Sequence, residues 1–144
     1  MRKLCFIAAI LVSFVATNAA NAQVRLSASL NINNQPGWGP TGYDHVDYYY
    51  IPDVDAYYDV NNHQYVYYDN NTWVHAQTLP SQYSSYDPYQ SYKVVVNQPN
   101  PWEHNDVYKE KYKSYKGHHS KQEVIRESRD GRYKEHWKND DDRH

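Results

Sequence analysis

Apolar and polar side chains alternate along much of the chain, and this alternation predicts β-strands. From Val24 to Ile32 an apolar side chain occupies every second position, which is the period of a strand with one buried face. Further runs are rich in Tyr and Val, which favour pleated sheets. They lie at residues 46–50, 54–60, 64–68, 72–76 and 92–96. Polar turn stretches separate neighbouring runs, so we expect a small antiparallel meander or open sheet over residues 23–98.

Two short polar loops predict how these strands pair. A three-residue loop at 61–63 would place Val60 opposite Gln64, and a turn across 69–72 would pair Tyr68 with Trp73. With this register one face carries the expected core: Val54, Ala56, Tyr58, Val60, Val66, Tyr68 and Trp73. The opposite face carries a row of Tyr side chains beside carboxylates: Asp55, Tyr57, Asp59, Tyr65 and Tyr67.

Residues 99–144 form a charged, His-containing segment with weak helical signals. Three tyrosines recur at helical spacing between a candidate N-cap, Asp106, and a candidate stop, Gly117: Tyr108, Tyr112 and Tyr115. Residues 120–123 fit a capping box ahead of Val124. Helices this short are marginal in isolation, so we expect a polar tail with short helices or disorder. The fold class predicted for the whole chain is therefore mainly β.

The first 22 residues have the pattern of an export signal. Arg2 and Lys3 precede an apolar run over residues 4–16, and a small-x-small cleavage motif ends at Ala22. As a helix this run would span about 20 Å, which is less than the ~30 Å hydrocarbon core of a membrane. We therefore expect cleavage before Gln23, no stable membrane insertion, and a secreted or periplasmic protein.

Composition restricts both the core and the chemistry. Of the 122 residues after residue 22, 17 are Leu, Ile or Val, whereas 17 are Tyr and 4 are Trp, so aromatic side chains must supply much of the buried area. The single Cys and the single Met both lie within the first 22 residues. A disulfide framework, a cysteine nucleophile and a thiolate metal site are thereby excluded for the exported chain.

Charge divides the chain near Pro99–Pro101. No Lys or Arg lies between Arg25 and Lys93, whereas residues 93–144 contain 12 basic and 10 acidic residues. Nucleic-acid binding depends on Lys and Arg at the phosphates, so the sheet region is not expected to bind nucleic acid. The change in charge marks the expected boundary between the tyrosine-rich β domain and the tail.

Three motifs that could carry chemistry have simpler interpretations. The G-x-G-x-x-G pattern at residues 37–42 contains Pro40 and is followed by a strand pattern, so we interpret it as a turn rather than a dinucleotide site. The eight His include adjacent His118 and His119 but no H-E-x-x-H pattern. Asp53, Asp55 and Asp59 lack the Gly and Glu of a calcium loop. We therefore expect no metal and no cofactor.

Longer patterns are similar to those of a known group of proteins. These patterns are WGPTGYDHVDYYYIPD at Trp38–Asp53, a hairpin segment ending in LP at Tyr68–Pro80, and YKVVVN at Tyr92–Asn97. Over about residues 24–104 the chain resembles small secreted, tyrosine-rich proteins of Bacteroidetes. The resemblance implies an exported envelope protein and says nothing about catalysis.

Two functions remain as hypotheses. A domain this small rarely encloses a cleft for paired catalytic carboxylates, so we expect no catalytic residue set and favour an exported, non-enzymatic structural or interaction module of the cell envelope. The alternative is glycan binding on a sheet face lined by Tyr57, Tyr65 and Tyr67 with Asp55 and Asp59. That alternative needs exposed rings. If the N-terminal strand or the 83–92 loop covers them, the tyrosines belong to the core.

Overall fold

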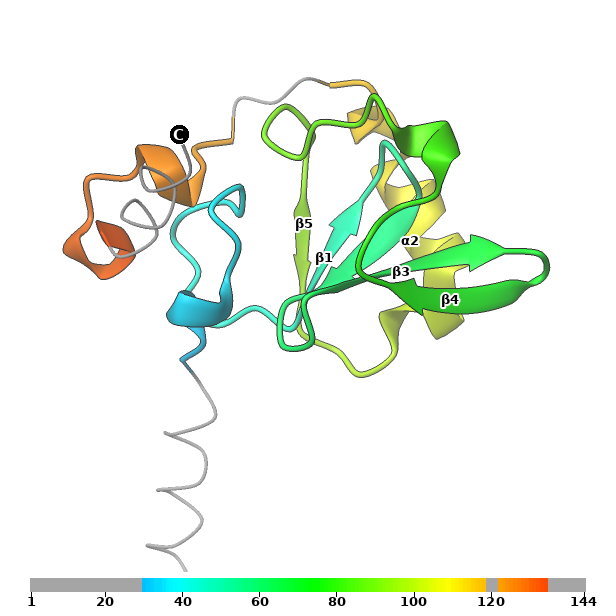
Figure 1. Cartoon of the computed structure of the whole chain (residues 1–144), viewed down its shortest axis with the longest axis horizontal. Helices are drawn as coiled ribbons and strands as arrows, with labels where there is room; N and C mark the ends of the chain where they lie inside the picture. Colours follow the sequence, from blue (N-terminus) through cyan, green and yellow to red (C-terminus); the bar gives the residue numbers. More distant parts are fainter. Residues whose placement is uncertain (1–29, 119–121, 135–144) are drawn as a thin grey trace, which may run out of the picture. The chain divides into compact units, whose positions relative to one another are not determined.

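The computed structural model describes residues 30–118 and 122–134, and the described residues from Asn31 onward belong to one compact unit. Five strands lie between its ends (Figure 1): β1 (Tyr48–Ile51), β2 (Ala56–Asp59), β3 (Gln64–Asp69), β4 (Thr72–Ala76) and β5 (Val94–Val96). One α-helix, α2, covers Asn105–Tyr112. The 3₁₀-helices are η1 (Ile32–Asn34), η2 (Ser81–Tyr83), η3 (Pro101–His104), η4 (Lys113–Tyr115), η5 (Ile125–Glu127) and η6 (Gly131–Tyr133). No helix of the described ranges is both long and apolar enough to span a bilayer.

The strands form one antiparallel sheet in the order β4-β3-β2-β1-β5 (Figure 1). The prediction of a mainly β fold with a small antiparallel sheet is therefore confirmed, and the first four strands follow one another as a meander. The strand expected over residues 24–32 is absent from its described end, because Ile32 begins η1. Residues 24–29 lie outside the described residues.

Asn and Asp residues make the tight turns that the sequence predicted. A two-residue turn joins β3 to β4, and both of its residues have positive φ, 46° at Asn70 and 63° at Asn71. Such turns match the twist of the strands that they connect, and Asn adopts this conformation more readily than most residues. The predicted pairing of Tyr68 with Trp73 follows from this turn and is confirmed.

The predicted pairing of β2 with β3 is wrong by one residue. Asp59, rather than Val60, lies opposite Gln64, so the loop has four residues instead of three. The Asp59 carboxylate closes this loop, because it accepts hydrogen bonds from the backbone N–H groups of Asn61 (3.0 Å) and Asn62 (2.9 Å). A shift of one residue moves every side chain of a strand to the other face relative to its neighbour.

Side chains of the sheet therefore form two separate cores. The first, which we call the loop-covered face, has the buried residues Val46, Tyr49, Ile51, Val54, Ala56, Tyr58 and Val60. Trp38, Leu79, Tyr83 and Tyr86 from loops pack on it. The second, the helix-covered face, has the buried residues Tyr50, Tyr57, Val66 and Val96, on which Trp102, Tyr108 and Tyr112 pack.

The helix predicted around the three tyrosines is present, and it covers one face of the sheet. Its N-cap position is His104 rather than Asp106, and Gly117 (φ 75°) follows the η4 turn that ends this segment. Tyr108 and Tyr112 reach the Tyr50 ring, with centroids at 5.8 and 6.2 Å. Packing against the sheet stabilises a helix that is too short to be stable alone.

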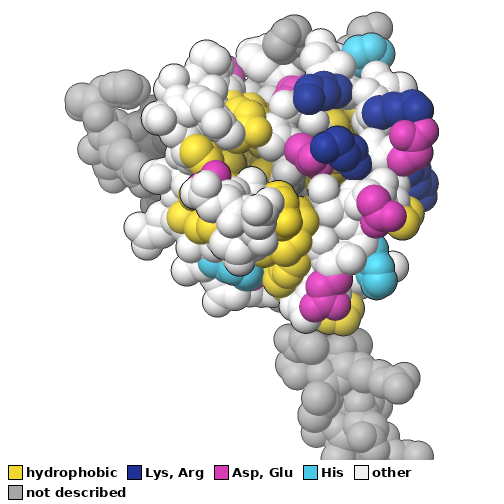
Figure 2. Space-filling view, turned by 90° about the vertical axis from the view of Figure 1, so that its right-hand side faces the viewer, with side chains coloured by type: hydrophobic (Ala, Val, Ile, Leu, Met, Phe, Trp, Pro, Cys, Tyr) yellow, Lys and Arg dark blue, Asp and Glu magenta, His cyan; other side chains and the backbone are white. Residues whose placement is uncertain are grey.

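The change in charge near Pro99–Pro101 does not coincide with a boundary in packing. Beyond α2, Val124 pairs with Pro40 in a β-bridge, and Ile125 and Tyr133 are buried. Residues 120 and 121 of the proposed capping box lie outside the described residues, and in the described stretch after it the 3₁₀-helix η5 forms instead of an α-helix. In Figure 2 Lys and Arg side chains lie beside Asp and Glu on one side of the visible surface, apart from most of the hydrophobic side chains. The rest of the predicted tail, residues 135–144, lies outside the described residues.

Candidate functional site

The five residues predicted to form a tyrosine-lined face do not share one face. Tyr57 is fully buried on the helix-covered face, where its ring meets Tyr108 edge-on at 5.8 Å. Tyr65 and Tyr67 are half-buried and pack on the loop-covered face. The hypothesis of a common exposed face is therefore wrong, and its physical reason is the one-residue shift between β2 and β3.

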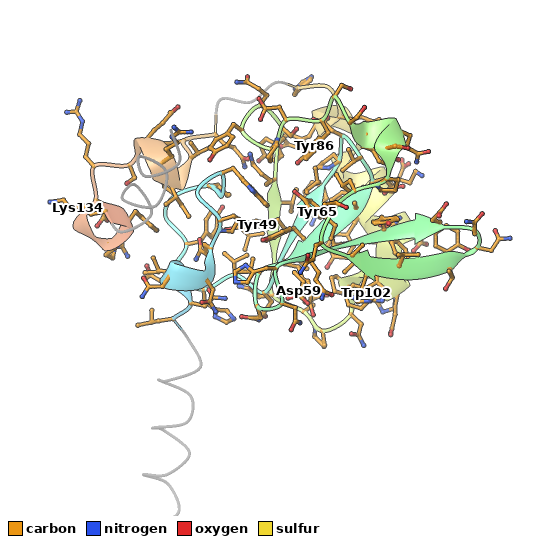
Figure 3. All side chains as sticks on the ribbon, viewed as in Figure 1. Tyr49, Asp59, Tyr65, Tyr86, Trp102 and Lys134 are labelled. Carbon is orange, nitrogen blue, oxygen red and sulfur yellow. The ribbon has the colours of Figure 1, made fainter. Side chains whose placement is uncertain are left out.

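Both predicted carboxylates stabilise the fold instead of lining a platform. Asp59 is 4% exposed and closes the β2–β3 turn (Figure 3). Asp55 accepts hydrogen bonds from Tyr50 (3.0 Å), Asn105 (3.2 Å) and Lys109 (2.8 Å). Burial by itself would raise the pKa of Asp55, but these three donors hold that pKa below its usual value. Asp55 therefore links β1 and α2, and its φ of 49° is one that Asp tolerates.

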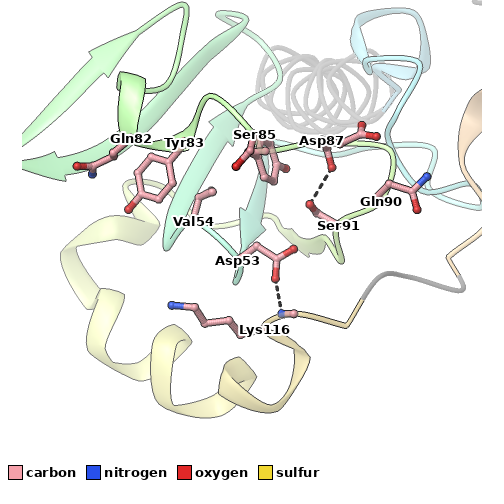
Figure 4. Close-up of a pocket in the computed structure, with 11 residues that line it drawn as sticks. Asp53, Val54, Gln82, Tyr83, Ser85, Asp87, Gln90, Ser91 and Lys116 are labelled. Atoms are coloured by element: carbon pink, nitrogen blue, oxygen red, sulfur yellow. Dashed lines mark hydrogen bonds between the residues drawn. The ribbon is translucent and has the colours of Figure 1, made fainter.

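A pocket lies elsewhere, against the loop between β4 and β5 (Figure 4). Its volume is about 510 Å³, within the range of small-molecule sites. Three segments far apart in sequence line it: the β1–β2 turn, the 82–91 loop and the end of the helical segment. The lining residues are Asp53, Val54, Gln82, Tyr83, Ser85, Tyr86, Asp87, Gln90, Ser91, Lys116 and Gly117.

Hydrogen bonds within the chain shape this pocket. The Asp53 carboxylate accepts from the backbone N–H of Gly117 at 2.6 Å, which fixes the helical segment against the β1–β2 turn. Asp87 accepts from the backbone N–H of Tyr89 (2.9 Å) through its side chain and from the Ser91 hydroxyl (2.9 Å) through its carbonyl. The loop is thus held by bonds to its own backbone, as in a compact Ω-loop.

A buried lysine, Lys93, is hydrogen-bonded to the 82–91 loop. Lys93 is 1% exposed, donates from Nζ to the Pro88 carbonyl, and lies 5.9 Å from the centre of the Trp38 ring. Burial lowers the pKa of Lys93 to about 8, although Asp87 and Asp53 act in the opposite direction. Its backbone exchanges two hydrogen bonds with the Gln122 amide, both 2.8 Å long.

Tyrosines separate this pocket from a second, smaller one. The second pocket, of about 300 Å³, is lined by Tyr65 together with Tyr83, Tyr86 and residues 77–81. Burial raises the pKa of Tyr65 to about 12. The Tyr86 hydroxyl (Figure 3) is buried, and within the described residues it makes no hydrogen bond of normal geometry, although the Ser91 side chain lies close enough to interact with it. Of the five predicted residues, only Tyr65 lines one of these two pockets, and Asp53, which lines the other, was not among the five.

The other motifs form turns or carry no site. Residues 37–42 make turns whose carbonyls at Gly37 and Gly39 accept from the backbone of residues 126 and 125, which confirms the interpretation of the G-x-G-x-x-G pattern as a turn. A Cβ on Gly39 would lie 2.7 Å from the Tyr49 hydroxyl, so this position needs glycine. Within residues 30–118 and 122–134 no three His, Cys, Asp or Glu side chains are placed to hold a metal.

Sequence reasoning missed the main pocket, although one signal was present. Residues 81–91 read SQYSSYDPYQS, a long polar and aromatic connection with no strand or helix period. Loops of this length inside a compact domain are often functional. Asp53 and Gly117, which complete the pocket, are separated by 64 positions, so no local pattern relates them.

Comparison with known proteins gives no further indication of the function. No protein-family model, curated protein or solved structure matches the chain significantly. The interpretation of the site therefore depends on its geometry, and membership of the secreted Bacteroidetes group stays a prediction.

Proposed function

We propose that this protein is an exported, non-enzymatic interaction module of the bacterial cell envelope, and that it holds its partner in the pocket beside the 82–91 loop. Export is supported by the charged, apolar and small-residue pattern of the first 22 residues. Binding is supported by a preformed pocket whose lining combines aromatic rings with hydrogen-bonding groups.

A binding role fits the state of the carboxylates better than a catalytic role does. Glycoside hydrolysis needs two carboxyl groups free to transfer protons or to attack the substrate. In this pocket Asp53 and Asp87 each accept a hydrogen bond from backbone N–H, and these bonds hold the walls together. The observation that carries the proposal is this pocket of about 510 Å³, whose acidic groups serve its structure.

The experiment combines export with binding. Mass spectrometry of the protein recovered from its native host should find Gln23 at or near the N-terminus. An intact chain embedded in the membrane would contradict export. The recovered protein should also cosediment with isolated envelope material of the same cells.

Neighbouring serines provide a matched pair of variants. Ser84 and Ser85 are both exposed, but Ser85 lines the first pocket and Ser84 the second. Ser85→Trp should fill the first pocket and abolish cosedimentation, and Ser84→Trp should leave it intact. Release of envelope fragments that is lost in Asp53→Asn would show that the protein is an enzyme and would contradict the proposal.

A further inference from the structure

Neutral hydrogen-bonding groups predominate in the wall of the first pocket. Two carboxamides, Gln82 and Gln90, and the Ser85 hydroxyl belong to the lining, together with the Tyr83 ring (Figure 4). Carboxamides and hydroxyls each offer a donor and an acceptor. A ligand that carries many hydroxyl groups, each both donor and acceptor, matches such a lining.

Apolar surface completes the pocket. Val54 is buried beneath it, and Tyr83 packs on the same core. A pyranose ring has polar edges and faces of C–H groups, so it can place a face against an aromatic ring while its edge forms hydrogen bonds. The combination of a Tyr ring with amides and hydroxyls is therefore suited to a sugar more than to a purely apolar ligand.

A buried hydroxyl that lacks a well-aligned hydrogen bond supports the same conclusion. Tyr86 lines both pockets, and its hydroxyl oxygen is buried with no hydrogen bond of normal geometry among the described residues. A buried polar group of this kind is costly unless another molecule satisfies it. A sugar hydroxyl that enters the pocket can supply the missing partner.

The charges around the pocket do not favour an anionic ligand. Among the described lining residues two carboxylates, Asp53 and Asp87, accompany one lysine, Lys116. Lys93 lies behind the wall with its Nζ bonded to the Pro88 carbonyl. A phosphate or sulfate group would gain no net attraction from these balanced charges, and an uncharged ligand needs none.

We propose that the pocket beside the 82–91 loop binds an uncharged saccharide, with a sugar ring against Tyr83 and a sugar hydroxyl bonded to Tyr86. The inference rests on the proposed binding function and names its ligand class. It moves carbohydrate recognition from the predicted sheet face, which the register excludes, to a loop that covers that sheet.

NMR titration of the exported protein tests this with three probes: cellobiose, chitobiose and glucose 6-phosphate. At least one uncharged disaccharide should bind with a Kd in the millimolar range, as expected for a few sugar contacts. Ser85→Trp should abolish binding, and Ser84→Trp should retain it. Tyr86→Phe removes a hydroxyl that makes no well-aligned hydrogen bond within the described protein, so it should change the thermal midpoint little and weaken binding about 5- to 10-fold.

Several outcomes would contradict the proposal that the ligand is an uncharged saccharide. Binding of glucose 6-phosphate alone, binding lost in Ser84→Trp but kept in Ser85→Trp, or no binding of either disaccharide in the millimolar range would each do so. The proposed function fails separately. If neither disaccharide binds but cosedimentation with envelope material is still lost in Ser85→Trp, the pocket binds a ligand of another class and the interaction module stands.

Discussion

The two faces of the sheet are covered by different kinds of segment: a helix covers one face, and loops that leave pockets cover the other. On the helix-covered face, α2 lies across the sheet and its side chains form a hydrogen-bonded network with Tyr50, Tyr57 and Asp55. On the loop-covered face, irregular segments supply the cover, and two pockets remain, with a buried Tyr86 hydroxyl that has no well-aligned hydrogen bond among the described residues. In this protein the helix buries the central tyrosines of its face, whereas the loops leave space that a ligand can use.

The network on the helix-covered face also shows how Tyr replaces aliphatic residues in a small core. Each buried Tyr brings a large ring and a hydroxyl that needs a partner. Tyr57 donates to the Asn105 side chain at 2.8 Å, and that side chain donates to Asp55 at 3.2 Å. The polar groups of the cover therefore satisfy the hydroxyls of the sheet, which makes α2 part of the folding unit.

Raising the pH should destabilise both faces at once, and this is the largest effect that we expect. Burial raises the pKa of Tyr65 to about 12 and also raises the pKa of Tyr49, Tyr50, Tyr57 and Tyr86. Above pH 10 the unfolded chain releases protons that the folded chain keeps, so the free energy of unfolding falls as pH rises. Each such tyrosine contributes up to about 1.4 kcal/mol per pH unit.

Urea unfolding followed by circular dichroism between pH 8 and pH 12 measures this loss, with tyrosinate absorbance recorded in parallel. Unfolding and most of the tyrosine ionisation should occur together. Ionisation complete near pH 10 in a chain that stays folded would show that these rings are accessible to solvent, and it would remove the distinction between covered and open faces.

Removing one tyrosine ring from each face should reduce the free energy of unfolding by different amounts. Tyr57→Ala leaves a cavity under α2 and should reduce the free energy of unfolding by about 3–5 kcal/mol. Tyr65→Ala, at the wall of a pocket, should cost about half as much, because Tyr65 is only half-buried. Tyr68→Ala, at a position 57% exposed, should change stability by less than about 1 kcal/mol.

Equal losses for Tyr57→Ala and Tyr65→Ala would contradict the view that the loop-covered face is the looser one. Where Tyr57→Ala fails to fold, Tyr57→Phe gives a second measurement. It keeps the ring and leaves the Asn105 side chain without its donor, so it should reduce stability by about 1 kcal/mol.

The sequence predicted β3, β4 and the helix well, because each has a local signal. The period of two, the Asn70-Asn71 turn and the spacing of Tyr108 and Tyr112 all act over a few residues. The bounds of β4 agree with the prediction at both ends, and β3 differs by one residue at one end. Local patterns therefore set where these elements lie, although the helix needs the sheet for its stability.

The candidate site could not be predicted in the same way. Alternation correctly sorted the side chains of β2 into two opposite faces, and did the same for β3. The Asp59 side chain set the length of the loop between them, and so decided which face of β2 continues into which face of β3. Likewise, the 81–91 loop has no period, and its pocket exists because Asp53 and Gly117 meet across 64 positions. Contacts of this kind are tertiary and leave no pattern in a single sequence.

The Asp55 network should account for a smaller, measurable part of how α2 is held on its face. Asp55→Asn keeps a residue that tolerates positive φ but removes the charge that receives Lys109 (2.8 Å). We expect a loss of about 1.5–3 kcal/mol, typical of hydrogen bonds to a charged group. Lys109→Met should cost less than about 1 kcal/mol, because Lys109 is exposed.

Lys113 on the same helical segment is the matched control, since it is exposed and pairs with the exposed Glu110 on that segment. Lys113→Met should leave urea unfolding unchanged. Because the folded pKa of Asp55 is below its usual value, its contribution is present above pH 4 and is lost as pH falls. A loss in Asp55→Asn no larger than that in Lys113→Met would show that packing alone holds α2.

Lys93 should give the loop-covered face a pH dependence of opposite sign to that of the tyrosines. Its folded pKa of about 8 lies below the usual 10.5, so above pH 8 the unfolded chain keeps a proton that the folded chain has released. Stability therefore rises with pH until the tyrosines begin to ionise near pH 10. Over these two pH units we expect the lysine to contribute a gain of up to about 2 kcal/mol. Lys93→Met keeps an apolar stem and should abolish the rise, whereas Lys109→Met should preserve it. If the free energy of unfolding of Lys93→Met rises with pH in the same way, the lysine is solvated in the folded chain. The 82–91 loop is then held by its own backbone hydrogen bonds rather than by Lys93.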